Sequence, residues 1–218
     1  MINILERYDS VIFDLDGTLI DSFEAINEAF NEVFSTFRDR KISFKESNSY
    51  VGVPLECLLG ELFGKENQDE AIDIFRNKYK EVCFEKTSLI KGVKELLVYL
   101  KKKGKSLSVA TNKTGSISRE LLDYLKINVF FDYVYGVCDG FEGKPSPEII
   151  HEIIQKTGIS KISTILVGDS PIDIMTAKNA GIPIFSVASG NHSYDELETC
   201  NPDYLSISIS GLAPGGVK

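Results

Sequence analysis

The sequence predicts an α/β protein, with a parallel sheet that carries helices on both faces and with an inserted all-α domain. Short apolar runs typical of buried strands alternate with segments whose apolar residues recur at helical spacing. Such alternation indicates a parallel sheet, because parallel strands need crossover connections that are usually helical. A further observation is one long gap. The first strand pattern ends at Asp14, and the next convincing one begins near Leu107.

This gap indicates the inserted domain. A strand–helix–strand unit takes roughly 30 residues, and the gap is far longer than that. A candidate capping box at Asp21-Ser22-Phe23-Glu24 opens the first helical pattern in it. Further helical patterns follow, with no good strand among them. We therefore expect a helical domain over residues 20–87, inserted into an α/β core that consists of residues 1–19 and 88–218.

Apolar runs and turn signals place the remaining elements. Gly104 is expected to end a helix that begins near residue 91, and Ser170-Pro171 combines a helix N-cap with proline at the first helical position. At Thr111-Asn112-Lys113 we expect a strand to stop and a helix to start. The other strands expected in this part of the chain are residues 133–137, 164–168, 182–187 and 204–207.

The composition is typical of a globular protein and argues against several classes of partner. With 218 residues, of which 43% are apolar, the chain can bury one substantial core. A formal net charge of -8 disfavours binding to nucleic acid phosphates, and no apolar run approaches a transmembrane length. The four cysteines are far apart, and the first residues lack a signal-peptide pattern. These features favour a cytoplasmic protein without nucleic acid or membrane partners.

An aspartate pair follows the first expected strand. After Val11-Ile12-Phe13 the chain presents Asp14, skips one residue and presents Asp16. Gly17 then lets the chain turn away. In open α/β sheets, ligands bind outside the carboxyl ends of the strands. Two carboxylates about 5 Å apart, at an effective dielectric constant near 20, repel each other by about 3 kcal/mol. The pair therefore predicts a bound cation.

Polar residues at other expected strand ends complete a site suited to phosphoryl transfer. Carboxylate and carbonyl oxygens are the ligands that Mg²⁺ prefers. Asp14 and Asp169 are candidate direct ligands, and Asp173 is either a further ligand or a neighbour of one. The backbone carbonyl of Asp16 is another candidate metal ligand. Lys144 supplies a positive charge for the phosphoryl oxygens.

Groups that bind and transfer the phosphoryl group are also present. The Thr111 hydroxyl and the Asn112 donor groups can hold its oxygens at a helix N-terminus. A carboxylate can attack phosphorus and form an aspartyl-phosphate. A second carboxylic acid can protonate the leaving oxygen and later deprotonate the hydrolytic water.

The ordered set of motifs resembles the four motifs of the haloacid dehalogenase superfamily. The long first gap resembles the helical cap that is inserted into a Rossmann-like core in its phosphoglycolate phosphatase-like branch. The resemblance implies that Asp14 is the nucleophile and Asp16 the general acid/base. It also implies Thr111 and Lys144 as phosphate ligands, with Asp169 and Asp173 at Mg²⁺. The motifs are Asp14-x-Asp16-Gly17-Thr18-Leu19, Thr111-Asn112, Lys144-Pro145 and Gly168-Asp169-Ser170-x-x-Asp173.

The resemblance implies a Mg²⁺-dependent hydrolase of a small phosphorylated metabolite. The sequence itself fits a monomer and a homodimer equally. The founding dehalogenases lack the second acid, so Asp16 argues for phosphate ester chemistry. The main alternative is a β-phosphoglucomutase-like mutase. Such mutases usually carry Val at the position of Thr18 and His near that of Ile26, and this chain has neither. A second alternative is a binding protein that kept the fold and lost catalysis.

Substrate choice is expected to depend on the cap. The segment 48–54 joins expected helices and resembles a substrate-facing loop, although a plain connector fits it equally well. Within it, Asn48 and Tyr50 are candidate specificity residues. Phe30 and Phe34 lie on one helical stripe, and we expect them in the core of the cap.

Overall fold

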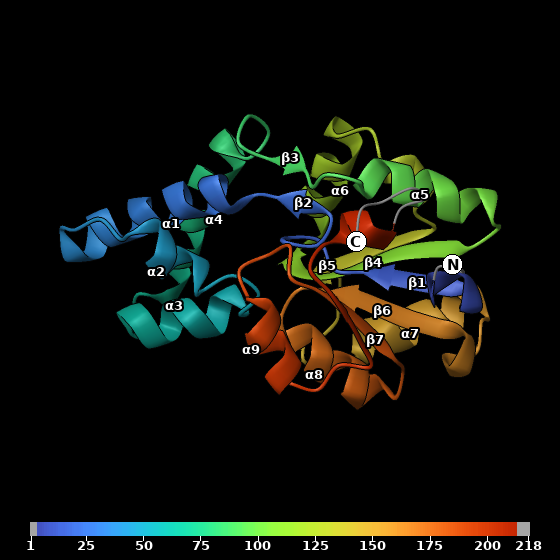
Figure 1. The fold of residues 1–218 in the computed structure, drawn as a ribbon. Helices are drawn as coiled ribbons and strands as arrows, with labels where there is room; N and C mark the ends of the chain where they lie inside the picture. Colours follow the sequence, from blue (N-terminus) through green and yellow to red (C-terminus); the bar gives the residue numbers. More distant parts are fainter. Residues whose placement is uncertain (1–3, 213–218) are drawn as a thin grey trace.

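The computed structural model describes residues 4–212, and its core is one six-stranded sheet with all strands parallel (Figure 1). The strand order is β5-β4-β1-β6-β7-β8, which confirms the expected α/β fold. From β1 the chain builds the sheet outward in both directions, to β4 and β5 on one side and to β6, β7 and β8 on the other. In parallel sheets of this kind, ligands bind at the carboxyl ends of the strands where the direction changes. The strands are β1 (Ser10–Phe13), β4 (Ser106–Thr114), β5 (Tyr133–Val137), β6 (Thr164–Gly168), β7 (Ile184–Val187) and β8 (Tyr204–Ser206).

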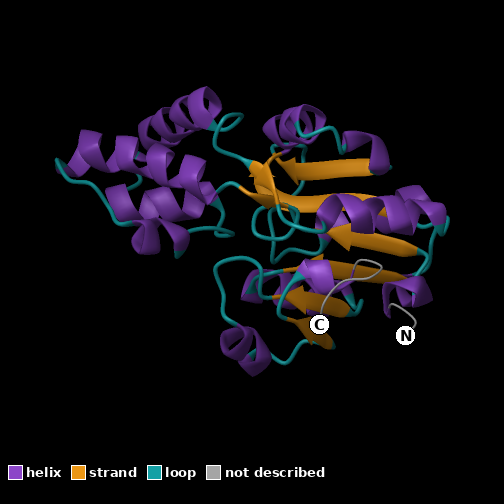
Figure 2. Cartoon of the chain, turned by 45° about the horizontal axis from the view of Figure 1, so that its top comes forward, coloured by secondary structure: helices purple, strands orange, loops and turns teal. Residues whose placement is uncertain are grey.

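Helices cover both faces of this sheet (Figure 2). One face packs against α5 (Val93–Lys102) and α6 (Gly115–Tyr124). The other packs against α7 (Glu148–Thr157), α8 (Pro171–Ala180) and α9 (Tyr194–Thr199). The short 3-10 helices are η1 (Ile4–Arg7), η2 (Asn128–Phe130), η3 (Lys161–Ser163) and η4 (Ile209–Leu212).

The central strand β1 is continuously apolar in sequence because it is buried on both faces of the sheet. Its side chains alternate between the two faces, and both faces are covered. Val11 and Phe13 pack in the core on the α5 side, whereas Ile12 packs in the core on the α7 side. All three residues are fully buried. A strand of this kind brings any polar residue that follows it to the edge of the sheet.

Four further helices, here called the cap helices, lie beyond the end of the sheet (Figure 1). The chain passes to them through β2 (Ile20–Asp21) and returns through β3 (Ser88–Leu89), and these two strands pair antiparallel. Phe30 and Phe34 are buried there, as expected. The division into residues 20–87 and a core of 1–19 and 88–218 stays a prediction, and residues 1–3 and 213–218 lie outside the described chain. The cap helices are α1 (Phe23–Arg38), α2 (Phe44–Asn48), α3 (Leu55–Phe63) and α4 (Gln68–Val82).

The structure differs from two local expectations. β4 continues to Thr114, past the expected end at Thr111, because its register with β5 shifts between Ala110 and Thr114 and leaves an irregular extended stretch. The candidate capping box at the start of α1 is also wrong. The N-cap residue is Ser22 and not Asp21, and Ser22 makes no capping hydrogen bond because its hydroxyl donates to the Asp16 side chain. The Asp21 side chain instead accepts a hydrogen bond from the Phe23 N–H at 3.3 Å. Within residues 4–212, no helix combines the length and apolar character that a membrane span requires.

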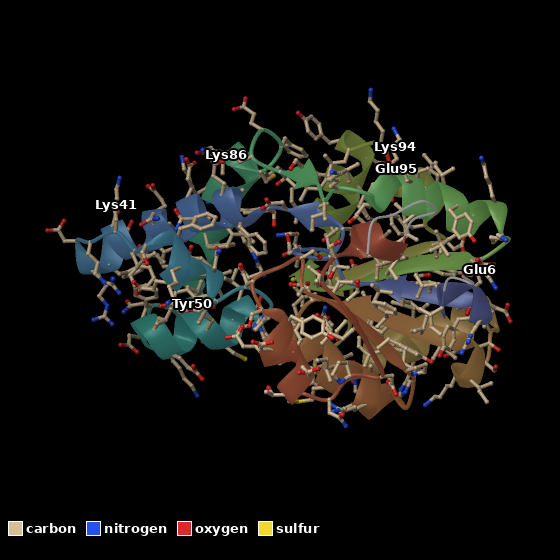
Figure 3. The ribbon with its side chains drawn as sticks, viewed as in Figure 1. Glu6, Lys41, Tyr50, Lys86, Lys94 and Glu95 are labelled. Carbon is tan, nitrogen blue, oxygen red and sulfur yellow. The ribbon has the colours of Figure 1, made fainter. Side chains whose placement is uncertain are left out.

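Removing core volume from α5 should destabilise the protein. Leu97 is fully buried against the sheet, so Leu97→Ala is expected to lower the free energy of unfolding by about 2–5 kcal/mol. Lys94 is exposed on the same helix (Figure 3), and Lys94→Ala should change it by less than about 0.5 kcal/mol. Urea unfolding followed by circular dichroism measures both values. Equal losses for the two variants would contradict this packing.

Candidate active site

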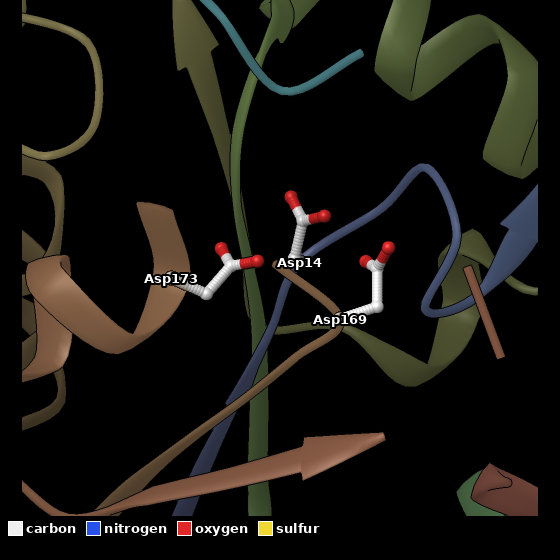
Figure 4. Close-up of side chains that lie close together, drawn as sticks. All are labelled: Asp14, Asp169 and Asp173. Atoms are coloured by element: carbon white, nitrogen blue, oxygen red, sulfur yellow. The ribbon is translucent and has the colours of Figure 1, made fainter. Parts of the chain in front are cut away.

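Three buried carboxylates meet at the carboxyl ends of two central strands. Asp14 directly follows β1, Asp169 directly follows β6, and Asp173 lies in the first turn of α8. Each offers one oxygen, and these oxygens all lie within 4.8 Å of one another. Figure 4 shows the three side chains grouped together. Because all three residues are buried, this cluster is not an ordinary solvated acidic patch.

The cluster has the electrostatics of a cation site. Burial raises the pKa of Asp14 to about 7, despite the neighbouring Lys144 ammonium, and the charge of Asp173 adds to the rise. Burial and the charge of Asp14 raise the pKa of Asp169 well above its usual range. A divalent cation would offset both effects, and a set of carboxylate oxygens suits Mg²⁺. The residues therefore fit the expected metal.

Lys144 reaches the same carboxylates from the loop between β5 and α7. Its side chain is 3% exposed, and Nζ lies 2.6 Å from Asp14 Oδ1 and 2.6 Å from Asp173 Oδ1. Asn112 holds this loop. Its Oδ1 accepts the Lys144 N–H at 2.6 Å, and its Nδ2 donates to the carbonyls of Lys144 at 2.9 Å and Gly52 at 2.8 Å. Asn112 thus positions Lys144, and its expected role as a phosphate ligand stays a prediction.

The second acid of the pair, Asp16, lies outside the carboxylate cluster and is held from two sides. Lys113 Nζ lies 3.2 Å from Asp16 Oδ2, and the Ser22 hydroxyl donates to Oδ1. The Lys113 side chain is 10% exposed, and Nζ sits 4.1 Å from the centre of the Tyr79 ring in α4. Our sequence argument missed Lys113 as a functional group, although it directly follows Thr111-Asn112. The backbone carbonyl of Asp16 as a metal ligand stays a prediction.

A loop that the sequence analysis did not consider packs against Asp169. Gly190, between β7 and α9, and Gly17 lie so close to Asp169 that a Cβ on either would overlap its carboxylate. Thr18 Oγ1 donates to Asp169 Oδ1 at 2.8 Å, and Ser189 Oγ donates to the Gly17 carbonyl at 3.0 Å. No sequence motif marks this loop, because the contact follows from the sheet order that places β7 beside β6.

Comparison with known proteins identifies the family. Residues 11–187 match the model of the haloacid dehalogenase-like hydrolases. The chain belongs to this family. It is 30% identical over 205 residues to pyrophosphatase PpaX of Halalkalibacterium halodurans, and the aligned region covers 94% of each protein. It is 29% identical over 213 residues to phosphoglycolate phosphatase of Vibrio parahaemolyticus, and the aligned region covers 93% of each protein. A haloacid dehalogenase-like hydrolase from Streptococcus pneumoniae superposes with a TM-score of 0.84 at 28% identity, covering 93% of this chain and 95% of that one.

In this hydrolase the carboxylate cluster opens into a cavity of about 250 Å³ between the sheet and the cap helices. Thr111, which is 1% exposed, lines it from β4. Tyr50 lines it from the loop after α2 (Figure 3). Asn48 instead accepts a hydrogen bond at its backbone carbonyl from Asn191 Nδ2 at 2.8 Å, which joins the cap to the β7–α9 loop. The specificity roles of Tyr50 and Asn48 stay predictions.

Crowding Asp169 should weaken metal binding. A methyl group at Gly190 would displace the Asp169 carboxylate, so Gly190→Ala is expected to weaken Mg²⁺ binding by about 10-fold or more. Isothermal titration calorimetry with MgCl₂ measures this change. The control is Lys94→Ala, because this side chain is exposed on α5 and lies outside the cavity lining. Unchanged Mg²⁺ affinity in a folded Gly190→Ala variant would contradict the packing argument.

Proposed function

We propose that this chain is a Mg²⁺-dependent phosphomonoester hydrolase that acts on a small phosphorylated metabolite through an aspartyl-phosphate on Asp14. The observation that carries the proposal is the contact of Lys144 with Asp14 and Asp173 at the floor of a cavity. The buried ammonium of Lys144 attracts the phosphoryl oxygens, and the neighbouring Asp14 carboxylate supplies the oxygen that attacks phosphorus. The names of the relatives, a phosphoglycolate phosphatase and a pyrophosphatase, support a phosphorylated substrate.

The metal site would be formed by Asp14, Asp169 and Asp173, with the backbone carbonyl of Asp16 as a further ligand. The donor set suits a hard divalent cation, and the three carboxylates lie close enough to share one. When bound, Mg²⁺ supplies positive charge to the phosphoryl oxygens.

The reaction we propose has two steps. In the first, an Asp14 oxygen forms a bond to phosphorus while the bond from phosphorus to the leaving oxygen breaks, and Asp16 gives that oxygen its proton. In the second, a water oxygen bonds to phosphorus and the bond to Asp14 breaks, while Asp16 takes the proton from the water. Lys144 and Thr111 hold the phosphoryl oxygens throughout. The products are an alcohol and inorganic phosphate.

Lys113 is a positioning residue in this proposal. It acts through Asp16, whose carboxylate is held between the Lys113 ammonium and the Ser22 hydroxyl. Proton transfer needs the acid within hydrogen-bonding reach of the leaving oxygen. A carboxylate fixed at both oxygens keeps one orientation relative to Asp14.

The mutase alternative finds no support in the cavity lining. Ile26, near the position where the mutases carry His, lines the cavity from α1 and is 5% exposed. An aliphatic side chain cannot transfer a proton to or from a sugar hydroxyl. Thr18, where such mutases usually have Val, donates to Asp169. We therefore favour transfer to water.

The hydrolase proposal is tested with a generic aryl phosphate. Hydrolysis is expected to need Mg²⁺, to stop with EDTA, and to be lost in Asp14→Asn, because the amide cannot form the phosphoryl ester. Released phosphate is measured by a colorimetric assay. Asp123→Asn, an exposed position on α6, serves as the matched control and should keep full activity. Turnover that survives EDTA or Asp14→Asn would overturn the mechanism, and no turnover under any condition would favour the binding protein.

A second test concerns Lys113. Lys113→Met should lower kcat by about 10-fold, less than the roughly 10²–10⁴-fold contribution of a general acid or base, because Asp16 itself remains. KM should change little because Lys113 acts through Asp16. Lys113→Arg keeps the positive charge and should restore part of kcat. Steady-state kinetics of both variants provide the comparison. A rise in KM with unchanged kcat would instead make Lys113 a substrate ligand.

A further inference from the structure

The cavity has a polar floor and an apolar side. At the floor, Asp14, Thr111 and Lys144 surround the expected position of the phosphoryl group. A leaving group bound to that phosphorus must extend toward the cap helices. There the lining is apolar and aromatic. The lining residues on this side include Ile26, Phe30, Tyr50, Leu55, Phe75 and Tyr79.

The aromatic residues form one connected wall. The centre of the Phe30 ring lies 5.3 Å from that of Tyr50 and 4.7 Å from that of Phe75. Phe75 and Tyr79 are stacked, with ring centres 6.0 Å apart. Because each ring packs against a neighbour, the wall is already formed before a ligand binds. Burying an apolar ring against such a surface is favourable.

Of the cations that line this side, Lys113 and Arg76 are paired within the protein and Lys80 faces solvent. Lys113 pairs with Asp16 at 3.2 Å, and Arg76 of α4 pairs with Glu56 of α3 at 2.7 Å. Lys80 is exposed. Among the described residues, none of the lining cations on the cap side is both buried and without an acidic partner. An anionic group on the leaving group would meet cations that are already paired, or the solvated Lys80, whose attraction is screened by water, so it would regain little of the hydration that it loses.

Polar atoms at the margin of the wall have no protein partner. His192 Nδ1, from the β7–α9 loop, and Arg76 Nε are buried and make no hydrogen bond, and both residues line the cavity. Buried polar atoms are normally satisfied. Because the Arg76 charge is already paired with Glu56, these two atoms suit uncharged hydrogen-bonding groups of a ligand rather than a second anion. A suitable ligand therefore combines an apolar body with hydrogen-bonding groups at its edge.

We infer, on the basis of the proposed function, that the substrate is a phosphate monoester of a neutral alcohol with an apolar, ring-containing body. Substrates whose leaving group carries a second anion, a carboxylate or a phosphate, fit this cavity poorly. The volume of about 250 Å³ is close to the lower end of the range for small-molecule sites. A single ring system attached to the phosphate therefore suits it better than a polymer.

The test compares esters of similar intrinsic reactivity. Benzyl phosphate and ethyl phosphate both release a primary alcohol, so a difference in kcat/KM reports binding of the ring. We expect kcat/KM for benzyl phosphate to exceed that for ethyl phosphate by about 10-fold or more, and to exceed that for 2-phosphoglycolate, which is also an ester of a primary alcohol but carries a carboxylate. If 2-phosphoglycolate or ethyl phosphate is hydrolysed as efficiently as benzyl phosphate, the inference is overturned while the hydrolase remains. If no phosphate ester is hydrolysed, both proposals are overturned.

A variant of the wall gives an independent readout. Phe75→Ala should reduce the benzyl-to-ethyl ratio of kcat/KM to about one, and Phe75→Leu, which preserves apolar volume, should reduce it partially. Phe44 is 50% exposed on α2, and Phe44→Ala is the matched control that should keep the ratio. Phe75→Leu decides the question if Phe75→Ala does not fold. A ratio unchanged in a folded Phe75 variant would contradict the inference.

Discussion

Three carboxylates and one ammonium are buried together where β1 and β6 end, and the surrounding structure has to hold them there. Asp14, Asp169 and Asp173 repel one another in a poorly solvated place, and Lys144 offsets only part of this charge. Such a cluster is tolerable only if the backbone around it is rigid and the oxygens are oriented. The parallel sheet supplies that rigidity, because β1 and β6 are adjacent and covered on both faces.

Most of the fold and part of the site could be predicted from the sequence. β1, β5 and β6 are short apolar runs with clear ends, so their positions follow from pattern alone. Asp14 and Asp169 directly follow two of these strands, and the parallel order brings those ends to one edge. Lys144 was predicted only as a positive charge for the phosphoryl oxygens, and its contact with Asp14 at 2.6 Å required the structure.

The contacts that were missed all depend on tertiary packing. Lys113 looked like an ordinary turn residue, because its partner Asp16 lies far away in the sequence and Tyr79 belongs to the cap helices. Gly190 carried no signal, since what matters there is the missing Cβ next to Asp169. Asn112 was expected to face phosphate, yet its amide is directed at backbone groups of two loops. Periodicity and motifs place elements, but they do not reveal which side chains meet.

The chain leaves and rejoins the sheet domain through two strands that lie side by side, β2 and β3. Because this pairing brings the chain back to the place where it left, a change in length between β2 and β3 does not by itself shift the register of the six parallel strands. In evolution this arrangement separates two kinds of innovation. A lineage can exchange or remodel the inserted helices, while the carboxylate cluster at the ends of β1 and β6 is inherited unchanged.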